Sequence, residues 1–394
     1  MNNVHPIRLP KKAGIDPAEA RSGAVLSVDL DAIVENYRLL RLKSARAACA
    51  AVLKADAYGL GAARVGPALA AAGCRHFFVA HLDEGIALRR VLPPACLIYV
   101  LHGPMPGAEA EFTAHGLRPV LNGLEQIDAW RALSRKADMA LPAALQVDSG
   151  MARLGLSPAE LTVLDDAPER LFGISVSLVL SHLSWAEIPE HPANVDALQR
   201  FRALRARLPA APASFANSSG IFLGPDYHFD LLRPGAALYG LAPQAGRKNP
   251  MRPVVTLQGK VIQTRSVPAG TPVGYNGRFV AHTECRIATV GVGYADGFLR
   301  CLGNKATASL RGYEVPVIGA VSMDLITLDV SAVRGEIAPG ERVDLIGGDA
   351  ASPDAIAAQA NTIGYEILTL LGGRYHRAYQ GGEAAASHEQ GDPS

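Results

Sequence analysis

The sequence predicts an α/β protein made of an N-terminal (β/α)8 barrel followed by a mainly β C-terminal domain. Three observations lead to this prediction. The chain has 394 residues, a length that suits roughly two or three domains. Between about residues 48 and 240, short apolar runs alternate with amphipathic helical patterns. After about residue 245 the helical periodicity almost disappears until 355–362, and short β-type runs are separated by Gly and Pro turns.

The barrel prediction rests on apolar runs that have the length of buried strands. Helical patterns such as 124–136 and 195–208 lie between them. Repeated units of this kind predict parallel strands that close into a barrel. A six-stranded doubly wound sheet is the main competing fold, but no G-x-G-x-x-G pattern follows the first strand. The runs are 48–53, 77–80, 96–101, 117–121, 144–147, 174–180, 214–216 and 231–232.

The second domain is predicted from β-type runs at 254–259, 261–264, 285–292, 308–310, 315–318, 325–330 and 342–346. We therefore expect an N-terminal extension at 1–24, the barrel at 25–245 and the mainly β domain at 246–380. The polar segment 381–394 is expected to be a disordered tail. The apolar run at 25–30 suits a strand of either domain.

Charge and composition exclude several classes of protein. Lys and Arg number 38 and Asp and Glu 37, so the chain lacks the basic excess of a general nucleic-acid binder. Apolar runs are too short for a membrane-spanning helix, and the N-terminus lacks the apolar core of a secretory signal. The five cysteines are widely spread without a C-x-x-C pair, which favours reduced cytoplasmic thiols and gives no support for a metal site.

Polar side chains follow every predicted barrel strand, at the end where barrel enzymes place their chemistry. Small-residue turns at 218–220 and 234–236 suit a phosphate site, although ordinary tight turns are the alternative. Lys54 follows an apolar run, and a desolvated lysine can form a Schiff base unless it is a solvated bystander. A reactive lysine beside a phosphate site indicates pyridoxal phosphate. The strand-end residues are Lys54, His81, His102, Asn122, Asp148, His182, Asn217 and Arg233.

Several segments resemble, in order, those of the alanine racemases, which are fold-type III pyridoxal-phosphate enzymes. The most specific is AVLKADAYGLG at 51–61, which resembles the family's cofactor-attachment motif. The others are VDSGMARLG at 147–155, SH at 181–182, ANSS at 216–219, RPG at 233–235, VGY at 273–275, GYADG at 293–297, SMD at 322–324 and GYE at 364–366. The resemblance extends over roughly residues 25–380 and implies a barrel followed by a β domain.

The resemblance implies two catalytic bases. Lys54 would hold the cofactor, and Tyr275 would reach the active site of the partner subunit in a homodimer. Racemisation removes a proton from one face of Cα and returns a proton to the other face. Two bases on opposite faces of a flat substrate adduct can do this directly. Arg153 would bond the phenolic oxygen of Tyr275 and lie near the substrate carboxylate. Without the resemblance, Tyr275 would be interpreted as a turn tyrosine.

The resemblance also implies a binding site for cofactor and substrate. Arg233 would face the pyridine nitrogen with support from His182. Because arginine supplies no proton at neutral pH, return of the proton to Cα is favoured over transamination. The backbone of Met323 would contact the substrate carboxylate, and Tyr294 would narrow the entrance to suit alanine. The other cofactor positions are Tyr58, Asn217, Ser218, Gly235, Ala236 and Tyr365.

Two positions depart from the family pattern. Leu60 replaces the histidine of the usual Gly-His-Gly ending of the attachment motif. Gln146 stands where many members carry a carbamylated lysine that orients the arginine corresponding to Arg153. The neutral amide oxygen of Gln146 can still accept from a guanidinium, so we expect this contact without a carbamate.

The resemblance therefore implies a cytoplasmic alanine racemase that makes D-alanine for the bacterial cell wall. A broader-specificity amino-acid racemase is the nearest alternative, because it would keep Lys54 and Tyr275 but accept larger side chains. A cofactor-binding protein without turnover is an alternative of another class. A second base supplied by the β domain argues against it, since cofactor storage needs no second base.

Overall fold

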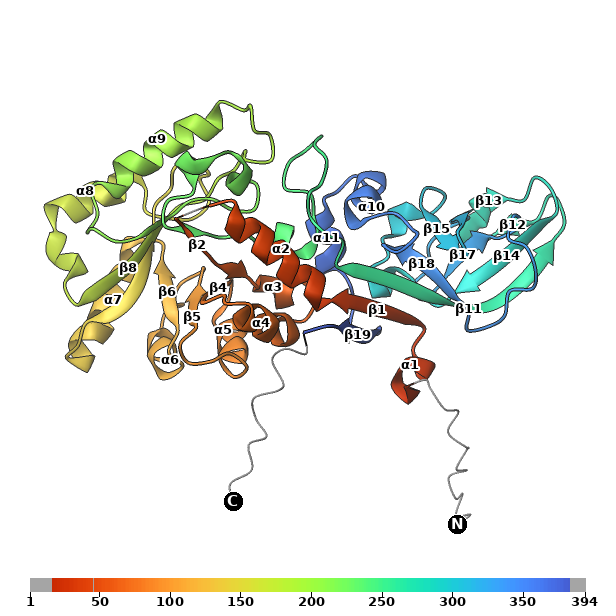
Figure 1. Cartoon of the computed structure of the whole chain (residues 1–394), viewed down its shortest axis with the longest axis horizontal. Coiled ribbons are helices and arrows are strands. Elements are labelled where there is room, and N and C mark those ends of the chain that lie inside the picture. The colour runs from red at the N-terminus through yellow and green to blue at the C-terminus, as the bar shows by residue number, and fades with distance from the viewer. Residues whose placement is uncertain (1–15, 45, 383–394) are drawn as a thin grey trace, which may run out of the picture. The chain divides into compact units, whose positions relative to one another are not determined.

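The computed structural model describes residues 16–44 and 46–382 (Figure 1). Most of the expected N-terminal extension and of the expected tail therefore lies outside the described residues. The chain divides into two units. The barrel unit comprises Val28–Val255, Ser352–Leu370 and the residues from Tyr379, and the β unit comprises the residues up to Ser27, Thr256–Ala351 and Leu371–Ala378. Residues 352–370 thus pack with the barrel although they follow the β runs in sequence.

The strands of the barrel unit are parallel and follow one another in sequence order. The first strand is interrupted at Ala50, which separates β2 from β3. Each observed strand overlaps a predicted apolar run. The strands are β2 (Ala48–Cys49), β3 (Ala51–Val52), β4 (His76–Val79), β5 (Leu97–Val100), β6 (Arg118–Leu121), β7 (Leu141–Gln146), β8 (Ile174–Leu180), β9 (Ala213–Ser214) and β10 (Leu231–Leu232).

Backbone hydrogen bonds close this row of strands into a ring. β10 pairs in parallel with β2, joining the last strand to the first. On its other side, the N–H groups of Asp230 and Arg233 donate to the carbonyls of Ala213, the first residue of β9, and of Ala216, which follows that strand. The predicted α/β class, a barrel followed by a mainly β domain, is confirmed.

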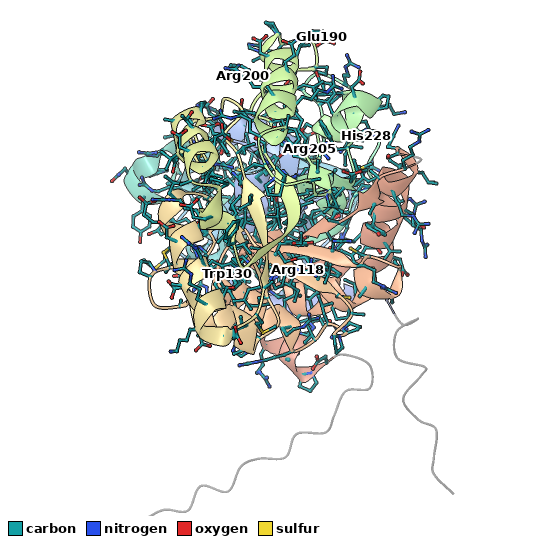
Figure 2. All side chains as sticks on the ribbon, turned by 90° about the vertical axis from the view of Figure 1, so that its left-hand side faces the viewer. Arg118, Trp130, Glu190, Arg200, Arg205 and His228 are labelled. Carbon is teal, nitrogen blue, oxygen red and sulfur yellow. The ribbon has the colours of Figure 1, made fainter. Side chains whose placement is uncertain are left out.

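Helices of the barrel unit follow the apolar spacing of the sequence. In α7 the buried residues Ile127, Trp130 and Ser134 recur at three- and four-residue intervals. Trp130, which is labelled in Figure 2, packs edge-on against Phe112 of α6, and the two ring centroids lie 5.9 Å apart. The helices are α2 (Leu30–Leu42), α3 (Lys54–Tyr58), α4 (Ala62–Ala71), α5 (Leu82–Arg89), α6 (Glu109–Ala114), α7 (Leu124–Ala137), α8 (Pro158–Asp166), α9 (Ala193–Arg205), α10 (Pro353–Ala360) and α11 (Gly364–Thr369). None of the helices in the described ranges is long and apolar enough to cross a membrane.

The β unit is organised around the long strand β11, which has two partners. Its first part pairs with β18 and its second part with β14, and a bulge lies between Val261 and Gln263. The sheet order is β16-β15-β18-β11-β1-β19, with β14 beside β11 and β17 beside β14. The predicted run at 25–30 thus forms β1 in the same sheet as β11. The strands are β1 (Ala24–Asp29), β11 (Val255–Val267), β14 (Cys285–Val290), β15 (Thr307–Leu310), β16 (Tyr313–Pro316), β17 (Ile326–Asp329), β18 (Arg342–Ile346) and β19 (His376–Gln380).

A small hairpin of β12 (Pro272–Val273) and β13 (Phe279–Val280) covers a separate cluster of apolar side chains. Val273, Ala281, Cys285, Ile287 and Ile318 form this cluster. The hairpin therefore has its own packed base. The remaining short elements are α1 (Pro17–Arg21) and the 3-10 turns η1 (Pro168–Leu171), η2 (Gly220–Phe222), η3 (Pro225–Tyr227), η4 (Ala236–Tyr239), η5 (Tyr275–Gly277), η6 (Tyr294–Asp296) and η7 (Arg300–Leu302).

Candidate active site

The predicted site residues fall into two groups, one in each unit. Tyr275, Tyr294 and Met323 belong to the β unit. The barrel unit holds the other group at or after the carboxyl ends of its strands and in α11. This group consists of Lys54, Tyr58, Arg153, His182, Asn217, Ser218, Arg233, Gly235, Ala236 and Tyr365.

Lys54 directly precedes a left-handed helical turn. Residues 55–58 are not glycines, yet all have φ between 53° and 56°. Such a conformation costs roughly 1–2 kcal/mol for each residue with a Cβ, so other contacts must offset the strain. Ala55 donates to Glu84 Oε1 at 2.6 Å, and Asp56 accepts from the N–H of Ala62 at 2.7 Å. Gly59 completes the turn where an added Cβ would lie 2.5 Å from the carbonyl oxygen of Leu368.

Burial and a nearby cation lower the pKa of the half-buried Lys54. Desolvation and the guanidinium of Arg153 lower the pKa of Lys54, whereas the carboxylate of Glu84 acts in the opposite direction. Desolvation and the cations of Arg233, Arg153 and Lys54 lower the pKa of His182 to about 3. The neutral imidazole of His182 is therefore favoured, and the protonated form of Lys54 is destabilised at this end of the barrel.

Arg233 is a buried cation held by neutral acceptors. Its Nη1 donates to Ser214 Oγ and its Nη2 to the carbonyl of Ser181, both at 2.5 Å. Burial lowers the pKa of Arg233 to about 10. The expected support from His182 is indirect: no hydrogen bond joins the two among residues 46–382, although His182 directly follows the bonded Ser181.

The turns after the last two strands meet at Ser218. Its Oγ accepts from the N–H groups of Gly235 at 3.0 Å and Ala237 at 3.1 Å. A Cβ added at Gly235 would lie 2.4 Å from the hydroxyl of Tyr58, so only glycine permits this approach. The structure thus brings Tyr58, Ser218, Gly235 and Ala236 together. Asn217 lies just before η2 and accepts from the N–H of Gly220, the first residue of that turn, at 2.9 Å.

Tyr365 lies beside Tyr58, with ring centroids 6.1 Å apart. Its hydroxyl donates to Glu187 Oε1 at 3.1 Å. Burial and the carboxylate of Glu187 raise the pKa of Tyr365. The hydroxyl proton of Tyr365 is therefore already donated to Glu187. To donate this proton to a phosphate, the hydroxyl would have to leave Glu187.

The loop that carries Arg153 is held in place by Asp148, which lies in the same loop. Asp148 Oδ1 accepts from the N–H groups of Gly150 at 2.8 Å and Met151 at 2.9 Å. The loop leaves Arg153 exposed. The expected contact with Gln146 is not found in the described part of the chain. Gln146 is buried instead, and its amide nitrogen donates to the carbonyl of Leu154 at 3.2 Å.

The hairpin of the β unit presents Tyr275 at its tip, where the side chain is 70% exposed. Gly274 and Asn276 on either side have φ values of 71° and 61°. These left-handed residues turn the chain sharply around Tyr275. The packed base of the hairpin and this sharp tip together hold an aromatic side chain in solvent.

Tyr294 and Met323 lie on loops that are bonded to each other. The N–H of Tyr294 donates to the carbonyl of Ser322, and the N–H of Ala295 donates to that of Met323, both at 3.0 Å. Arg374 strengthens this junction by bonding both oxygens of the buried Asp296 and, at 2.7 Å, Asp324. The two predicted substrate contacts are therefore fixed relative to each other.

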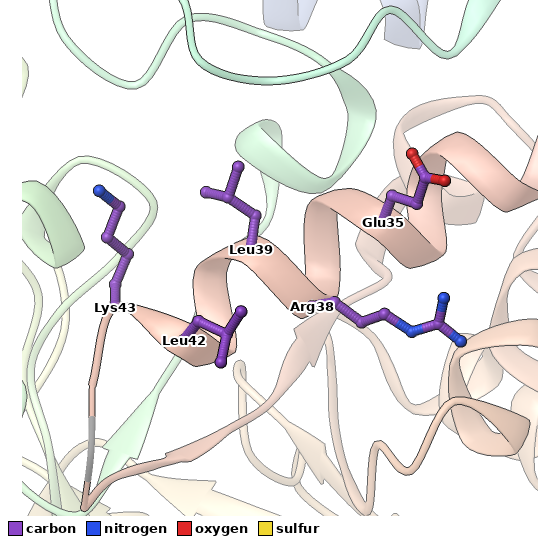
Figure 3. Close-up of a pocket in the computed structure, with 5 residues that line it drawn as sticks. All are labelled: Glu35, Arg38, Leu39, Leu42 and Lys43. Atoms are coloured by element: carbon purple, nitrogen blue, oxygen red, sulfur yellow. The ribbon is translucent and has the colours of Figure 1, made fainter.

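A surface pocket lies apart from these predicted residues. It has a volume of about 450 Å³ and is lined by Glu35, Arg38, Leu39 and Leu42 of α2 and by Lys43, which directly follows this helix (Figure 3). Glu35 is engaged in an ion pair with Arg252 at 2.7 Å. None of the predicted site residues lines this pocket, so it does not compete with the strand ends as the candidate site.

Two family models match the chain in succession. The model for the alanine racemase N-terminal domain matches residues 28–243, and that for the C-terminal domain matches residues 254–379. The chain belongs to the alanine racemase family.

Individual alanine racemases are similar along nearly the whole chain. The alanine racemase of Rhodospirillum rubrum is 52% identical over 365 residues, which cover 92% of this chain and 97% of that protein. A protein of Mesorhizobium japonicum named a catabolic alanine racemase is 50% identical over 380 residues, covering 96% and 99%. A crystal structure of the Bartonella henselae alanine racemase with covalently bound pyridoxal phosphate is 42% identical, with a TM-score of 0.88, and the match covers 91% and 100%.

Sequence reasoning missed several residues that hold this alanine racemase site together. Glu84, Ser214, Glu187 and Arg374 were not among the predicted residues. Glu84 carried a usable signal, because a glutamate three residues after a helix start commonly bonds back to that start. The partners of Arg374 and Tyr365 are distant in sequence, so no local pattern indicates them.

Proposed function

We propose that this protein is a pyridoxal-phosphate-dependent alanine racemase in which Lys54 and Tyr275 are the two bases. The single observation that carries the proposal is the half-buried Lys54 at the end of the first barrel strand, with its pKa lowered by burial and by Arg153. The covalently bound cofactor of the Bartonella henselae relative supports Lys54 as the attachment residue.

The barrel residues fit this cofactor. Ser218 Oγ accepts two backbone N–H bonds and keeps its own proton to donate to a phosphate oxygen. Gly235 lets the Tyr58 hydroxyl approach the turn at a point where a Cβ would lie 2.4 Å from it. Lys54 would attach the cofactor, and Arg233 with His182 would lie at its ring. Tyr58, Asn217, Ser218, Gly235, Ala236 and Tyr365 would surround its phosphate.

When bound, pyridoxal phosphate supplies an electron-withdrawing ring that weakens the Cα–H bond of a linked amino acid. Lys54 accepts or returns a proton at Nζ on one face of Cα. Its lowered pKa makes loss of the proton from Nζ easier than from a solvated lysine. Tyr275 performs the same exchange at its phenolic oxygen on the opposite face, and Arg153 stabilises the phenolate.

Arg233 determines the outcome by retaining its protons. A guanidinium donates hydrogen bonds but gives up no proton near neutral pH. A pyridine nitrogen facing Arg233 would therefore stay largely unprotonated. An unprotonated ring nitrogen favours return of the proton to Cα over transamination. Burial lowers the pKa of Arg233 only to about 10, so it remains a cation under these conditions.

The β unit supplies substrate selection and the second base from a partner subunit of a homodimer. The exposure of Tyr275, Tyr294 and Met323 supports this role, because it leaves these side chains accessible to another chain. Met323 offers its backbone N–H to the substrate carboxylate. Tyr294 narrows the entrance, so alanine is favoured over larger amino acids.

We assign the enzyme to D-alanine supply for peptidoglycan in the cytoplasm. A catabolic role is the second candidate, because relatives from Mesorhizobium japonicum and Agrobacterium fabrum, each 50% identical, are named catabolic. Deletion of the gene distinguishes the two roles. A requirement for external D-alanine supports cell-wall supply, whereas loss of growth on alanine as the nutrient supports catabolism.

The activity is tested with purified holoenzyme. We expect D-alanine from L-alanine and much slower racemisation of L-serine, L-lysine and L-arginine. Borohydride followed by peptide mapping should place the reduced cofactor on Lys54. Comparable rates with lysine or arginine would favour the broader-specificity racemase, and cofactor binding without racemisation would contradict the proposal.

A further inference from the structure

Glu84 of α5 is bonded to the turn after Lys54 and to the end of the neighbouring strand. Its Oε1 accepts from the N–H of Ala55 at 2.6 Å. Its Oε2 accepts from the N–H groups of Ala80 at 2.7 Å and His81 at 3.0 Å. All three donors are neutral backbone groups, so these bonds leave the negative charge of the carboxylate in place.

The bond to Ala55 reaches the first residue of the left-handed turn. Ala55–Tyr58 are strained because each carries a Cβ at positive φ. A strained turn persists only where its surroundings hold it, and Glu84 ties its start to a separate helix. The backbone on which the Lys54 side chain stands is thereby fixed to α5 and β4.

Charged and titratable groups from several elements act at Lys54. Arg153, from the loop after β7, lowers the pKa of Lys54, and Glu84 raises it. His102 follows β5 and His182 follows β8, and burial together with neighbouring cations lowers the pKa of both. Because both histidines tend to be neutral, Glu84 is the principal counterweight to Arg153.

We infer that Glu84 is a positioning residue for Lys54, whose carboxylate holds the left-handed turn and keeps a negative charge near the lysine nitrogen. The inference rests on the proposed role of Lys54 in attaching the cofactor. Glu84 would act in two separable ways. Its side chain is long enough to bond both the turn and the end of β4, and its negative charge acts on Lys54.

Two substitutions separate these properties. Glu84→Gln keeps the size but removes the charge, and its NH2 group replaces one of the acceptor oxygens. Glu84→Asp keeps the charge but is too short to bond Ala55 and β4 together. Glu160→Gln is the matched control, because Glu160 of α8 likewise accepts from the start of its helix, at the N–H of Ser157.

The decisive readout is a pH titration of the visible absorbance of the holoenzyme, which follows the nitrogen of Lys54 in its bond to the cofactor. Loss of the anion disfavours the protonated nitrogen, so Glu84→Gln should move the midpoint to lower pH. Glu84→Asp should move it less, and Glu160→Gln should leave it in place. We expect kcat to fall about a hundredfold in Glu84→Gln, with a smaller change in KM.

An unchanged midpoint in Glu84→Gln, with a loss of thermal stability like that of Glu160→Gln, would overturn the inference and leave Glu84 a helix cap. If Glu84→Gln fails to fold, Glu84→Asp decides: wild-type kcat and midpoint there would also overturn it. If borohydride places no cofactor on Lys54 of the wild type, the proposed function fails instead.

Discussion

The barrel unit and the β unit present their candidate residues in opposite ways. In the barrel, Ser218 and Arg233 are only 4% and 5% exposed, and burial shifts the pKa values of Lys54, His182 and Arg233. In the β unit, Tyr275 is 70% exposed, and Tyr294 and Met323 also face solvent. Apart from the exposed Arg153, the candidate residues of the barrel are buried or half-buried, whereas those of the β unit are exposed.

We propose that this difference reflects a division of the proposed chemistry between the two units. A buried cluster of cations can bind and polarise a cofactor without help from another chain. An exposed tyrosine on a rigid hairpin gains a function only when something else covers it. We therefore expect changes in the barrel to abolish cofactor attachment, and changes in the β unit to spare attachment but impair proton transfer.

The largest effect is expected from Lys54→Ala. Loss of the proposed attachment residue, which is also one of the two proposed bases, should lower racemisation by about a thousandfold or more. It should also remove the cofactor that borohydride fixes to the 51–61 peptide. D-alanine formation and peptide mapping measure both effects, and Lys136→Ala on the exposed face of α7 is the control. A borohydride-fixed lysine adduct elsewhere in the Lys54→Ala protein would contradict the barrel assignment.

Tyr275→Phe should impair turnover while the cofactor stays attached, because Tyr275 belongs to the β unit. We expect a loss of about a hundredfold to ten-thousandfold, the range of a missing general base. Solvent deuterium should enter D-alanine more readily than L-alanine, since Lys54 still exchanges its own face of Cα. Tyr313→Phe in β16 serves as control. Equal losses of both exchanges would argue against two bases with separate faces.

Acid should weaken the barrel through His182. Its pKa is about 3 in the folded chain against 6.5 when unperturbed, so the unfolded state binds the proton more tightly. This stability is present above pH 6.5 and is lost as the pH falls toward 3. Between pH 7 and 5 the loss should be about 2 kcal/mol in the free energy of unfolding.

Urea unfolding at about pH 7 and pH 5 measures this loss of stability. In His182→Gln, which lacks the titrating imidazole, most of this pH-dependent loss should disappear. The exposed His282 of the β unit provides the comparison, since His282→Gln should keep the wild-type pH dependence. A pH dependence that is the same in all three proteins would show that His182 is not a buried neutral group.

The smallest effect is expected from Arg374→Lys in the β unit. Lysine cannot make the paired bonds to Asp296 and also reach Asp324, so the loops of Tyr294 and Met323 should loosen. We expect KM for alanine to rise roughly three- to tenfold with a smaller change in kcat. Arg311→Lys, which alters the ion pair with Glu341, is the matched control. An equal rise in KM for both variants would remove this role of Arg374.

Much of the fold followed from the sequence because apolar periodicity is local. Each barrel run became a strand, and the predicted helices at 124–136 and 195–208 are α7 and α9. The left-handed turn at 55–58 could not be predicted in this way, because Ala, Asp and Tyr rarely adopt positive φ. Contacts formed in the folded chain, such as those of Glu84 with Ala55 and of Asp56 with Ala62, help to hold that conformation.

The candidate site was predicted unevenly for the same reason. Ser218 and Gly235 lie in turns with a recognisable small-residue pattern, and the structure joins them. Gln146 was expected to bond Arg153, but Asp148 closes the loop on itself and leaves Gln146 to bond Leu154. A pairing between side chains depends on the path of the whole loop, which sequence spacing does not determine.

The most direct test of the two-part site mixes Lys54→Ala chains with Tyr275→Phe chains. A heterodimer would contain one site with Lys54 from one subunit and Tyr275 from the other. If chains exchange freely from equal amounts, activity should return to roughly a quarter of the wild-type value, because half of the dimers carry one intact site. If chain exchange is demonstrated and activity stays at the level of the separate variants, the two bases do not come from different subunits.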